Sequence, residues 1–240
     1  MTTGAVPPPT DARTRARAVL KGDSAFASCP DAVIDEVMRR AKVQKYTKGE
    51  SLCRQGDAGD SLMIVLTGSL KVTNVTSEAK EVVLGFLKSG SLIGEIAALD
   101  GRSRTANVVA LEATEAVIIY RRDLMPILRQ NPDAMFALLE GLCGRLRSTI
   151  ELVESYSLET DTRVAGSLVR FMDEHGQKIK DGIAIDLKLT QRDLGSYLGL
   201  TRETVSRTLS EFRDQGLVEM RGTVIVVLDA DGLRTIAEGA

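Results

Sequence analysis

The sequence predicts an α+β chain in three parts: a jelly-roll-like β-roll, a long central helix and a C-terminal winged helix-turn-helix. Short apolar runs separated by glycines occupy residues 43–121, as in a sheet of many short strands. An apolar seam with alternating spacings of four and three follows, and then come two capped helical patterns and a strand pair. The predicted boundaries are 1–20 for a disordered tail, 21–131 for the β-roll with flanking helices, 132–157 for the central helix and 158–240 for the winged helix-turn-helix.

Composition narrows the classes of function. The 240 residues are 43% hydrophobic, which is enough to bury a sizeable core. The net charge is −2 and the pI is about 5.7, so any contact with nucleic acid must come from a local patch. Cys29, Cys53 and Cys143 are widely spaced and contain no C-x-x-C pair. This spacing argues against a disulfide scaffold and against a four-cysteine iron–sulfur site.

The chain begins with MTTGAVPPPTDA, which lacks the basic start and the apolar stretch of a signal peptide. No uninterrupted apolar segment approaches the roughly 20 residues that a bilayer span requires. We therefore expect a cytoplasmic protein without a membrane partner.

Residues 21–131 predict the β-roll and its flanking helices. Runs such as LMIVL and EVVLGFL are typical of strands, and QGDAGD, TGS and KSGS supply the turns between them. Helical patterns flank the strands, DAVIDEVMRRAK before them and RDLMPILRQ after them. Many short strands at near-regular spacing indicate a sandwich or a rolled sheet.

Residues 132–157 predict one long helix, with Pro132 in its first turn. The 4-3 alternation of its apolar residues is typical of two helices wound on each other, which favours a parallel homodimer. The same face packed on the chain's own sheet is the alternative. Thr149 is the polar member of the seam, and it either fixes the register of the dimer or faces a ligand. The seam consists of Met135, Leu139, Leu142, Leu146, Thr149, Val153 and Tyr156.

Residues 158–240 predict a winged helix-turn-helix. Thr190 and Asp193 have the spacing of a capping box at the start of a first helix, which Gly199 ends. Thr201 then caps a second helix, RETVSRTLSEFRDQG, and the strand runs LVEM and TVIVVL surround a tight Arg-Gly turn. Across the turn between the helices, the facing apolar residues are Leu194, Leu198, Val205, Leu209 and Phe212.

The second of these helices carries the side chains suited to reading DNA. Arg202, Glu203 and Arg207 lie in its first two turns, the part of such a helix that enters a major groove. Arginine can donate two hydrogen bonds to guanine, through O6 and N7, and glutamate can accept a hydrogen bond from the cytosine amino group. The alternative is that all three are ordinary solvated surface charges.

The segment GEIAALDGRSRTANVVA embeds two charges, Glu95 and Arg104, in sequence that otherwise predicts core. EIAAL is rich in small residues, so its free backbone N–H groups can approach a phosphate closely. Arg104 supplies a fork for the phosphate oxygens, and Glu95 suits a sugar hydroxyl. The segment therefore favours a nucleotide held by its ribose and phosphate, with a Glu95–Arg104 ion pair as the alternative.

Three stretches resemble one family of dimeric bacterial transcription factors, that of the cAMP receptor protein and the fumarate–nitrate reduction regulator. GEIAALDGRSRTA is similar to the family's phosphate-binding cassette, and GDAGDSLMIVLTGSLKV resembles the first half of the same domain. LTQRDLGSYLGLTRETVSRTLSEFRDQGLV is similar to its helix-turn-helix. The resemblance covers about residues 20–230. It implies a cyclic-nucleotide-binding β-roll, a dimerisation helix and a DNA-binding domain.

The resemblance also implies roles for single residues. Glu95 would bind the ribose 2′-hydroxyl, Arg104 and Thr105 the cyclic phosphate, and Thr149 the adenine amino group. Val72 and Leu84 fall where the family lines the base pocket. The implied ligand contacts are Val72, Leu84, Gly94, Glu95, Ile96, Ala97, Arg104, Thr105 and Thr149. The implied DNA contacts are Thr190, Thr201, Arg202, Glu203 and Arg207.

The expected effector is cAMP, with cGMP also possible because Ile150 stands where a second polar residue would help bind adenine. We expect no metal, haem or iron–sulfur cluster. The expected partners are a second copy of the chain and pseudo-palindromic promoter DNA, with RNA polymerase implied by the resemblance alone.

Other classes of function find less support. No nucleophile–base pair or metal cluster can be assembled, and His175 in DEHGQK is expected to be a solvated surface residue, so an enzyme is not expected. Cys143 is expected to be a buried packing residue, with a redox input as the alternative. DNA binding without an effector, or a purely structural oligomer, are further alternatives, and the arginines of the second helix argue against the latter.

Overall fold

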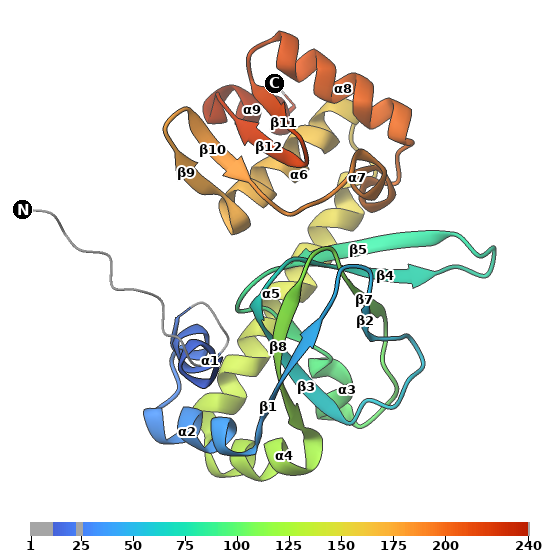
Figure 1. The fold of residues 1–240 in the computed structure, drawn as a ribbon. Coiled ribbons are helices and arrows are strands. Elements are labelled where there is room, and N and C mark those ends of the chain that lie inside the picture. The colour runs from blue at the N-terminus through green and yellow to red at the C-terminus, as the bar shows by residue number, and fades with distance from the viewer. Residues whose placement is uncertain (1–11, 23–25, 240) are drawn as a thin grey trace, which may run out of the picture. The chain divides into compact units, whose positions relative to one another are not determined.

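The computed structural model of the chain describes residues 12–22 and 26–239 (Figure 1). They divide into two compact units. The first holds the described residues of Met1–Ser69 and Leu87–Cys143, and the second holds Leu70–Phe86 and Gly144–Ala240. The second unit thus includes a short segment of the predicted β-roll together with the whole predicted winged helix-turn-helix.

The first unit is built on an antiparallel sheet with the strand order β1-β8-β3-β6. Its strands are β1 (Lys42–Tyr46), β8 (Thr114–Tyr120), β3 (Ser61–Thr67) and β6 (Leu92–Ile93). Strand β3 forms because its LMIVL run is buried on both faces, and it pairs with β8 in the register Leu62↔Ile119 and Ile64↔Val117. Two shorter strands, β2 (Ser51–Cys53) and β7 (Asn107–Ala110), pair antiparallel with each other. The predicted strand-rich region is confirmed.

Three helices pack against the apolar core of this unit: α1 (Ala12–Lys21), α2 (Asp31–Arg40) and α4 (Arg121–Gln130). The expected disordered tail is wrong for residues 12–20, because Ala16 and Leu20, one helical turn apart, are fully buried in the core. Residues 1–11 of that tail lie outside the described residues. Helices α2 and α4 confirm the two flanking helical patterns.

The predicted long helix is α5 (Pro132–Ser155), which begins at the proline as expected. Its first turns bury Ala134, Ala137 and Leu138 in the core of the first unit. No helix among the described residues has the length and apolarity that a bilayer span needs.

The second unit contains the predicted winged helix-turn-helix. Helices α7 (Gln191–Leu198) and α8 (Arg202–Asp214) form the helix pair, and β11 (Val218–Arg221) and β12 (Val224–Val227) form the wing. Gly222 makes the wing turn with a left-handed φ of 67°. All five predicted facing residues between α7 and α8 are buried, so the predicted core of this domain is confirmed.

The second unit also contains elements that the sequence analysis did not single out. The wing strands continue into a four-stranded sheet of order β11-β12-β10-β9, flanked by helices that pack on each other. The additional elements are α6 (Thr160–His175), β9 (Gln177–Ile179), β10 (Gly182–Ile185) and α9 (Ala230–Ala237). Strand β4 (Leu70–Val75) and all but the last residue of β5 (Glu81–Leu87) also fall in this unit, and β5 is the predicted strand run EVVLGFL.

Candidate functional site

A short helix, α3 (Glu95–Asp100), follows strand β6 and is bounded by two left-handed glycines. Gly94 precedes it and Gly101 ends it, each with a φ of 76°. A Cβ atom on Gly94 would lie 1.5 Å from Nη1 of Arg104. Only glycine therefore satisfies both the backbone conformation and the close approach of the arginine.

Arg104 lies in the loop between α3 and β7 (Asn107–Ala110), three residues before the strand. The loop is fixed by two backbone hydrogen bonds, from Arg104 N–H to Asp57 O at 2.8 Å and from Gly56 N–H to Arg104 O at 2.9 Å. The side chain of Arg104 is buried, with Nη2 donating to Ser61 Oγ at 2.8 Å and Nη1 to Gly94 O at 3.0 Å. Backbone and side chain are thus both held in place.

The acceptors around this buried guanidinium are neutral. Among the described residues, Arg104 forms no ion pair, so the alternative of a Glu95–Arg104 ion pair is not observed. Glu95 is nevertheless buried, at 3% exposure, at the start of α3. An arginine has five N–H donors, and a buried cation is stabilised most by an anion. The arrangement is therefore suited to binding an anionic group.

The remaining residues of the predicted cassette differ in exposure. Ala97 is buried, whereas Ile96 and Thr105 are exposed. Arg102 is 87% exposed and its Nε lies 4.0 Å from the Asp100 carboxylate, so it is a solvated residue.

Sequence reasoning missed two residues that build this site. Ser61 is buried at the start of β3 and holds the guanidinium of Arg104. Gly59 allows α3 to approach, because a Cβ atom there would lie 2.2 Å from both Ala97 Cβ and Arg102 O. A polar residue opening the otherwise apolar run SLMIVL was the available indication for Ser61.

Three predicted ligand residues belong to the second unit: Val72, Leu84 and Thr149. Val72 is half-buried on β4 and Leu84 is exposed on β5. The Thr149 hydroxyl donates to Arg145 O at 2.9 Å, one turn back on α5. Their roles in ligand binding stay predictions.

The predicted seam of α5 leaves large apolar side chains exposed. Leu139, Leu146 and Val153 recur every seven residues and are 44%, 61% and 61% exposed. The residues at the two ends of the seam contact other parts of the chain. Met135 packs against the core of the first unit, and Tyr156 donates from its hydroxyl to Tyr197 O at 3.3 Å.

The helix-turn-helix has the local structure that its sequence predicts. Thr190 Oγ1 accepts from Asp193 N–H and the Asp193 carboxylate accepts from Thr190 N–H, so the capping box is confirmed. Thr201 Oγ1 accepts from Thr204 N–H at 3.1 Å and thereby starts α8.

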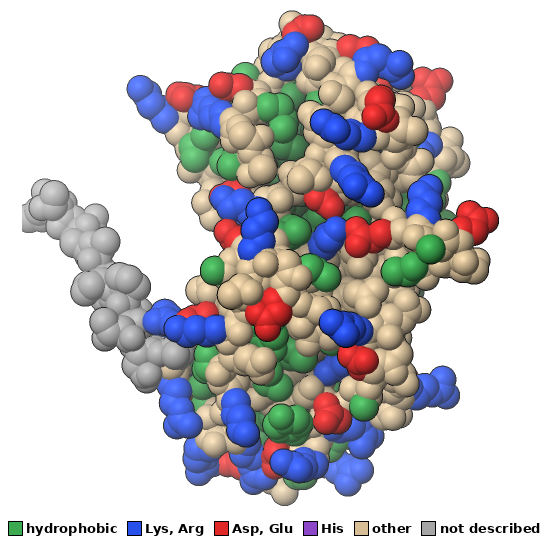
Figure 2. Space-filling model, turned by 45° about the vertical axis from the view of Figure 1, so that its right-hand side comes forward, with side chains coloured by type: hydrophobic (Ala, Val, Ile, Leu, Met, Phe, Trp, Pro, Cys, Tyr) green, Lys and Arg blue, Asp and Glu red, His purple; other side chains and the backbone are tan. Residues whose placement is uncertain are grey.

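Arg202, Glu203 and Arg207 are exposed on the first turns of α8, and none of them bonds another described residue. Basic and acidic side chains are interspersed over the face of this domain that Figure 2 shows. The free arginines of α8 are therefore set apart by their position and not by a surrounding block of positive charge.

Two expectations about single residues are wrong. Cys143 is exposed on α5 and not buried, whereas Cys29 and Cys53 are buried. His175 was expected to be a solvated surface residue, but it ends α6 with its side chain only 16% exposed and 3.5 Å from the Glu174 carboxylate. Among residues 12–22 and 26–239, no group of three or more His, Cys, Asp or Glu side chains is arranged to hold a metal ion.

Comparison with known proteins identifies both halves of the chain. Residues 43–131 match the family model described as "Cyclic nucleotide-binding domain", and residues 162–236 match the "Crp-like helix-turn-helix domain". The "cAMP-activated global transcriptional regulator CRP" of Salmonella typhimurium (strain LT2) is 30% identical over 200 residues, or 82% of this chain and 94% of that protein. The chain belongs to the Crp/Fnr family.

Solved structures show the same fold for this Crp/Fnr protein. FixK2 from Bradyrhizobium japonicum has a TM-score of 0.73 at 24% identity and covers 82% of this chain and 96% of its own. The c-di-GMP responsive regulator CLP of Xanthomonas campestris has a TM-score of 0.68 at 20% identity, with 83% and 100% coverage. These structures confirm the predicted fold class. The two family models and the curated relative show that the chain is a DNA-binding transcription regulator with a cyclic nucleotide-binding domain.

Proposed function

We propose that this regulator is a homodimer that binds one cAMP per chain and thereby changes its affinity for pseudo-palindromic promoter DNA. The observation that carries the proposal is the buried Arg104, whose guanidinium is held by neutral oxygens beside the left-handed Gly94. The curated relative from Salmonella typhimurium, described as cAMP-activated, supports cAMP as the effector.

In this proposal each residue of the cassette has one task. Arg104 and Thr105 bind the cyclic phosphate, because a guanidinium fork matches two phosphate oxygens. Glu95 accepts from the ribose 2′-hydroxyl, since a carboxylate beside a phosphate is tolerated only if it binds something else. Val72 and Leu84 contact the base, and Thr149 bonds its edge. This edge contact decides between cAMP and cGMP.

The homodimer is supported by the exposed apolar residues of α5. Leu146 and Val153 are both 61% exposed at heptad spacing, and a partner helix would bury them. Leu146→Asp should therefore give a monomer in sedimentation velocity. Arg147→Asp, which places an aspartate at the next exposed position but outside the seam, changes the charge by two units and should still remain a dimer. Two dimeric variants would contradict the assignment of this seam.

The test of the whole proposal is DNA binding with and without nucleotide. A palindromic duplex is first selected from a random library with the wild-type protein, and its affinity is measured by fluorescence anisotropy. We expect cAMP to change the Kd for the wild type and not for Arg104→Ala. If cAMP leaves the Kd of the wild type unchanged and cGMP or c-di-GMP changes it, the effector is that nucleotide and not cAMP. RNA polymerase is proposed as a further partner on family resemblance alone.

A further inference from the structure

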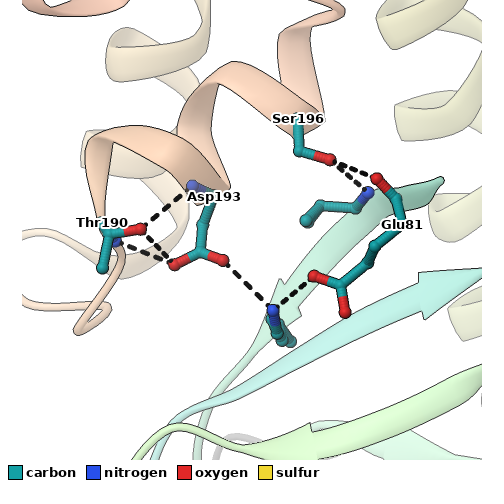
Figure 3. A network of polar contacts seen from close by, with 6 residues as sticks. Glu81, Thr190, Asp193 and Ser196 are labelled. Atoms are coloured by element: carbon teal, nitrogen blue, oxygen red, sulfur yellow. Dashed lines mark hydrogen bonds and ion pairs between the residues drawn. The ribbon is translucent and has the colours of Figure 1, made fainter. Parts of the chain in front are cut away.

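Within the second unit, strands β4 and β5 are bonded to the first helix of the helix-turn-helix (Figure 3). Lys71 on β4 places its ammonium 2.6 Å from Glu81 Oε1 on β5 and 3.2 Å from Asp193 Oδ1 on α7. The side chains of Lys71 and Asp193 are only 16% and 13% exposed. This pair is therefore less screened by solvent than an ordinary surface salt bridge.

Asp193 is also the residue that starts α7. Its Oδ2 atom accepts from the Thr190 backbone N–H at 3.1 Å and from the Thr190 hydroxyl at 2.7 Å, while Oδ1 faces Lys71. Burial alone would raise the pKa of Asp193, but the hydrogen bonds from Thr190 and the charge of Lys71 hold it below its ordinary value. Lys71 thus forms its ion pair with a carboxylate whose orientation is already fixed by the hydrogen bonds from Thr190.

Ser196, one helical turn further along α7, bonds to the backbone of β5. Its hydroxyl accepts from Val83 N–H at 3.1 Å and donates to Glu81 O at 3.0 Å. Strand β5 is at the edge of its sheet, where one side of the backbone has no neighbouring strand. The Ser196 hydroxyl therefore supplies the hydrogen bonds that a further strand would give to Val83 N–H and Glu81 O. A third contact is apolar, with the ring of Phe86 on β5 5.7 Å from that of Tyr197 on α7.

These contacts hold the helix-turn-helix without covering its DNA-reading residues. Arg202 and Arg207 on α8 stay exposed while α7 is bonded to the strands. Lys71 and Val72 are consecutive on β4, so they point to opposite faces of the sheet. The strand that bonds α7 through Lys71 therefore carries, on its other face, a residue predicted to line the base pocket.

We infer that the contacts of Lys71, Glu81 and Val83 with Asp193 and Ser196 form a latch that fixes the orientation of the helix-turn-helix for DNA binding. A dimer binds a palindrome tightly only if its two recognition helices are held at the spacing of the half-sites. The latch holds each domain in one orientation and so removes an ordering cost from DNA binding. The inference rests on the proposed homodimer.

The latch is tested with Lys71→Ala and Ser196→Ala. The matched control is Lys80→Ala, an exposed lysine between the same two strands, and Lys71→Arg should keep the ion pair and the wild-type behaviour. Each protein is titrated, in the presence of cAMP, with the selected palindrome, with one half-site, and with a palindrome lengthened between its half-sites. Backbone amide exchange at Val83 reports separately whether Ser196→Ala breaks its bond.

We expect both latch variants to bind the full palindrome roughly 2- to 30-fold more weakly than the Lys80→Ala control. Their affinity for one half-site should be unchanged. The difference in affinity between the selected palindrome and the lengthened palindrome should be smaller in the latch variants than in the control. Full-site affinity equal to or tighter than the control would overturn the inference, and so would an equal loss on the half-site. If the wild type is monomeric or shows no preference for the full palindrome, the proposed homodimer fails instead.

Discussion

Arg104 and the two arginines of α8 have the same side chain in opposite surroundings. Arg104 is 4% exposed and its guanidinium is bonded to Ser61 Oγ and Gly94 O. Arg202 and Arg207 are exposed and bond no other described residue. The first arginine is held in place before any ligand arrives, and the other two keep their freedom.

The difference matches what each site has to recognise. A cyclic phosphate has one shape, so a rigid guanidinium can be oriented for it in advance, which lowers the ordering cost of binding. The exposed guanidinium groups of Arg202 and Arg207 are not held by other residues, so each becomes ordered only when it contacts a base edge. Substitutions should therefore have larger effects at the buried site, and they should affect protein stability only there.

The largest expected effect is that of Arg104→Ala on cAMP affinity. Removing one partner of a buried, hydrogen-bonded charge pair costs about 2–5 kcal/mol, which is roughly 30-fold to several-thousand-fold in Kd. Calorimetric titration measures this loss. Arg102→Ala, two residues away and 87% exposed, is the control and should bind like the wild type. Equal losses in both variants would remove the special role of the buried arginine.

Gly94→Ala should disturb the same site through the backbone. A residue with a Cβ atom in the left-handed region costs about 1–2 kcal/mol, and here that atom also meets Arg104 Nη1 at 1.5 Å. Gly101→Ala is the matched control, because it has the same φ of 76° and its nearest atoms lie 3.5 Å away. In urea denaturation we expect Gly94→Ala to lose more stability than Gly101→Ala, and only Gly94→Ala to lose cAMP affinity.

Arg202→Ala should weaken binding to the selected palindrome by about 1–3 kcal/mol and leave unfolding unchanged. Non-specific duplex should lose much less affinity. Arg213→Ala is the control, since that arginine lies in the last turn of α8 and pairs with Asp214 at 2.9 Å. An equal loss on specific and non-specific DNA would reassign Arg202 to phosphate contact.

The smallest effect concerns the thiols, which show the same contrast of buried and exposed groups. Burial raises the pKa of Cys29 and of Cys53, so both stay protonated at pH 8, whereas Cys143 is exposed on α5. Mass spectrometry after brief alkylation of the folded protein should find one label, on Cys143. Rapid labelling of Cys29 or Cys53 would show that the core of the first unit opens.

The sequence predicted the parts of the molecule whose local pattern determines their structure. The capping box of Thr190 and Asp193, the start of α5 at Pro132 and the wing turn at Gly222 all depend on neighbouring residues, and all are confirmed. Arg104 was singled out because a charge inside an apolar run is itself a local pattern.

What depends on tertiary contacts was missed. Ser61 binds Arg104 across 43 residues of sequence, and Ser196 bonds β5 across a larger separation still, so neither contact leaves a local pattern. Cys143 was expected to be buried because free cysteines usually are, but residue type does not say which face of a helix the fold covers. The proline-rich start concealed that Ala16 and Leu20 complete the core.

The most direct test of the central claim is calorimetric titration of the nucleotide-stripped wild type with cAMP, cGMP and adenosine. If the buried Arg104 binds the cyclic phosphate, cAMP should bind at one site per chain. Adenosine, which lacks the phosphate, should then bind at least about 100-fold more weakly. Adenosine that binds as tightly as cAMP, or no binding of either cyclic nucleotide, would contradict the account.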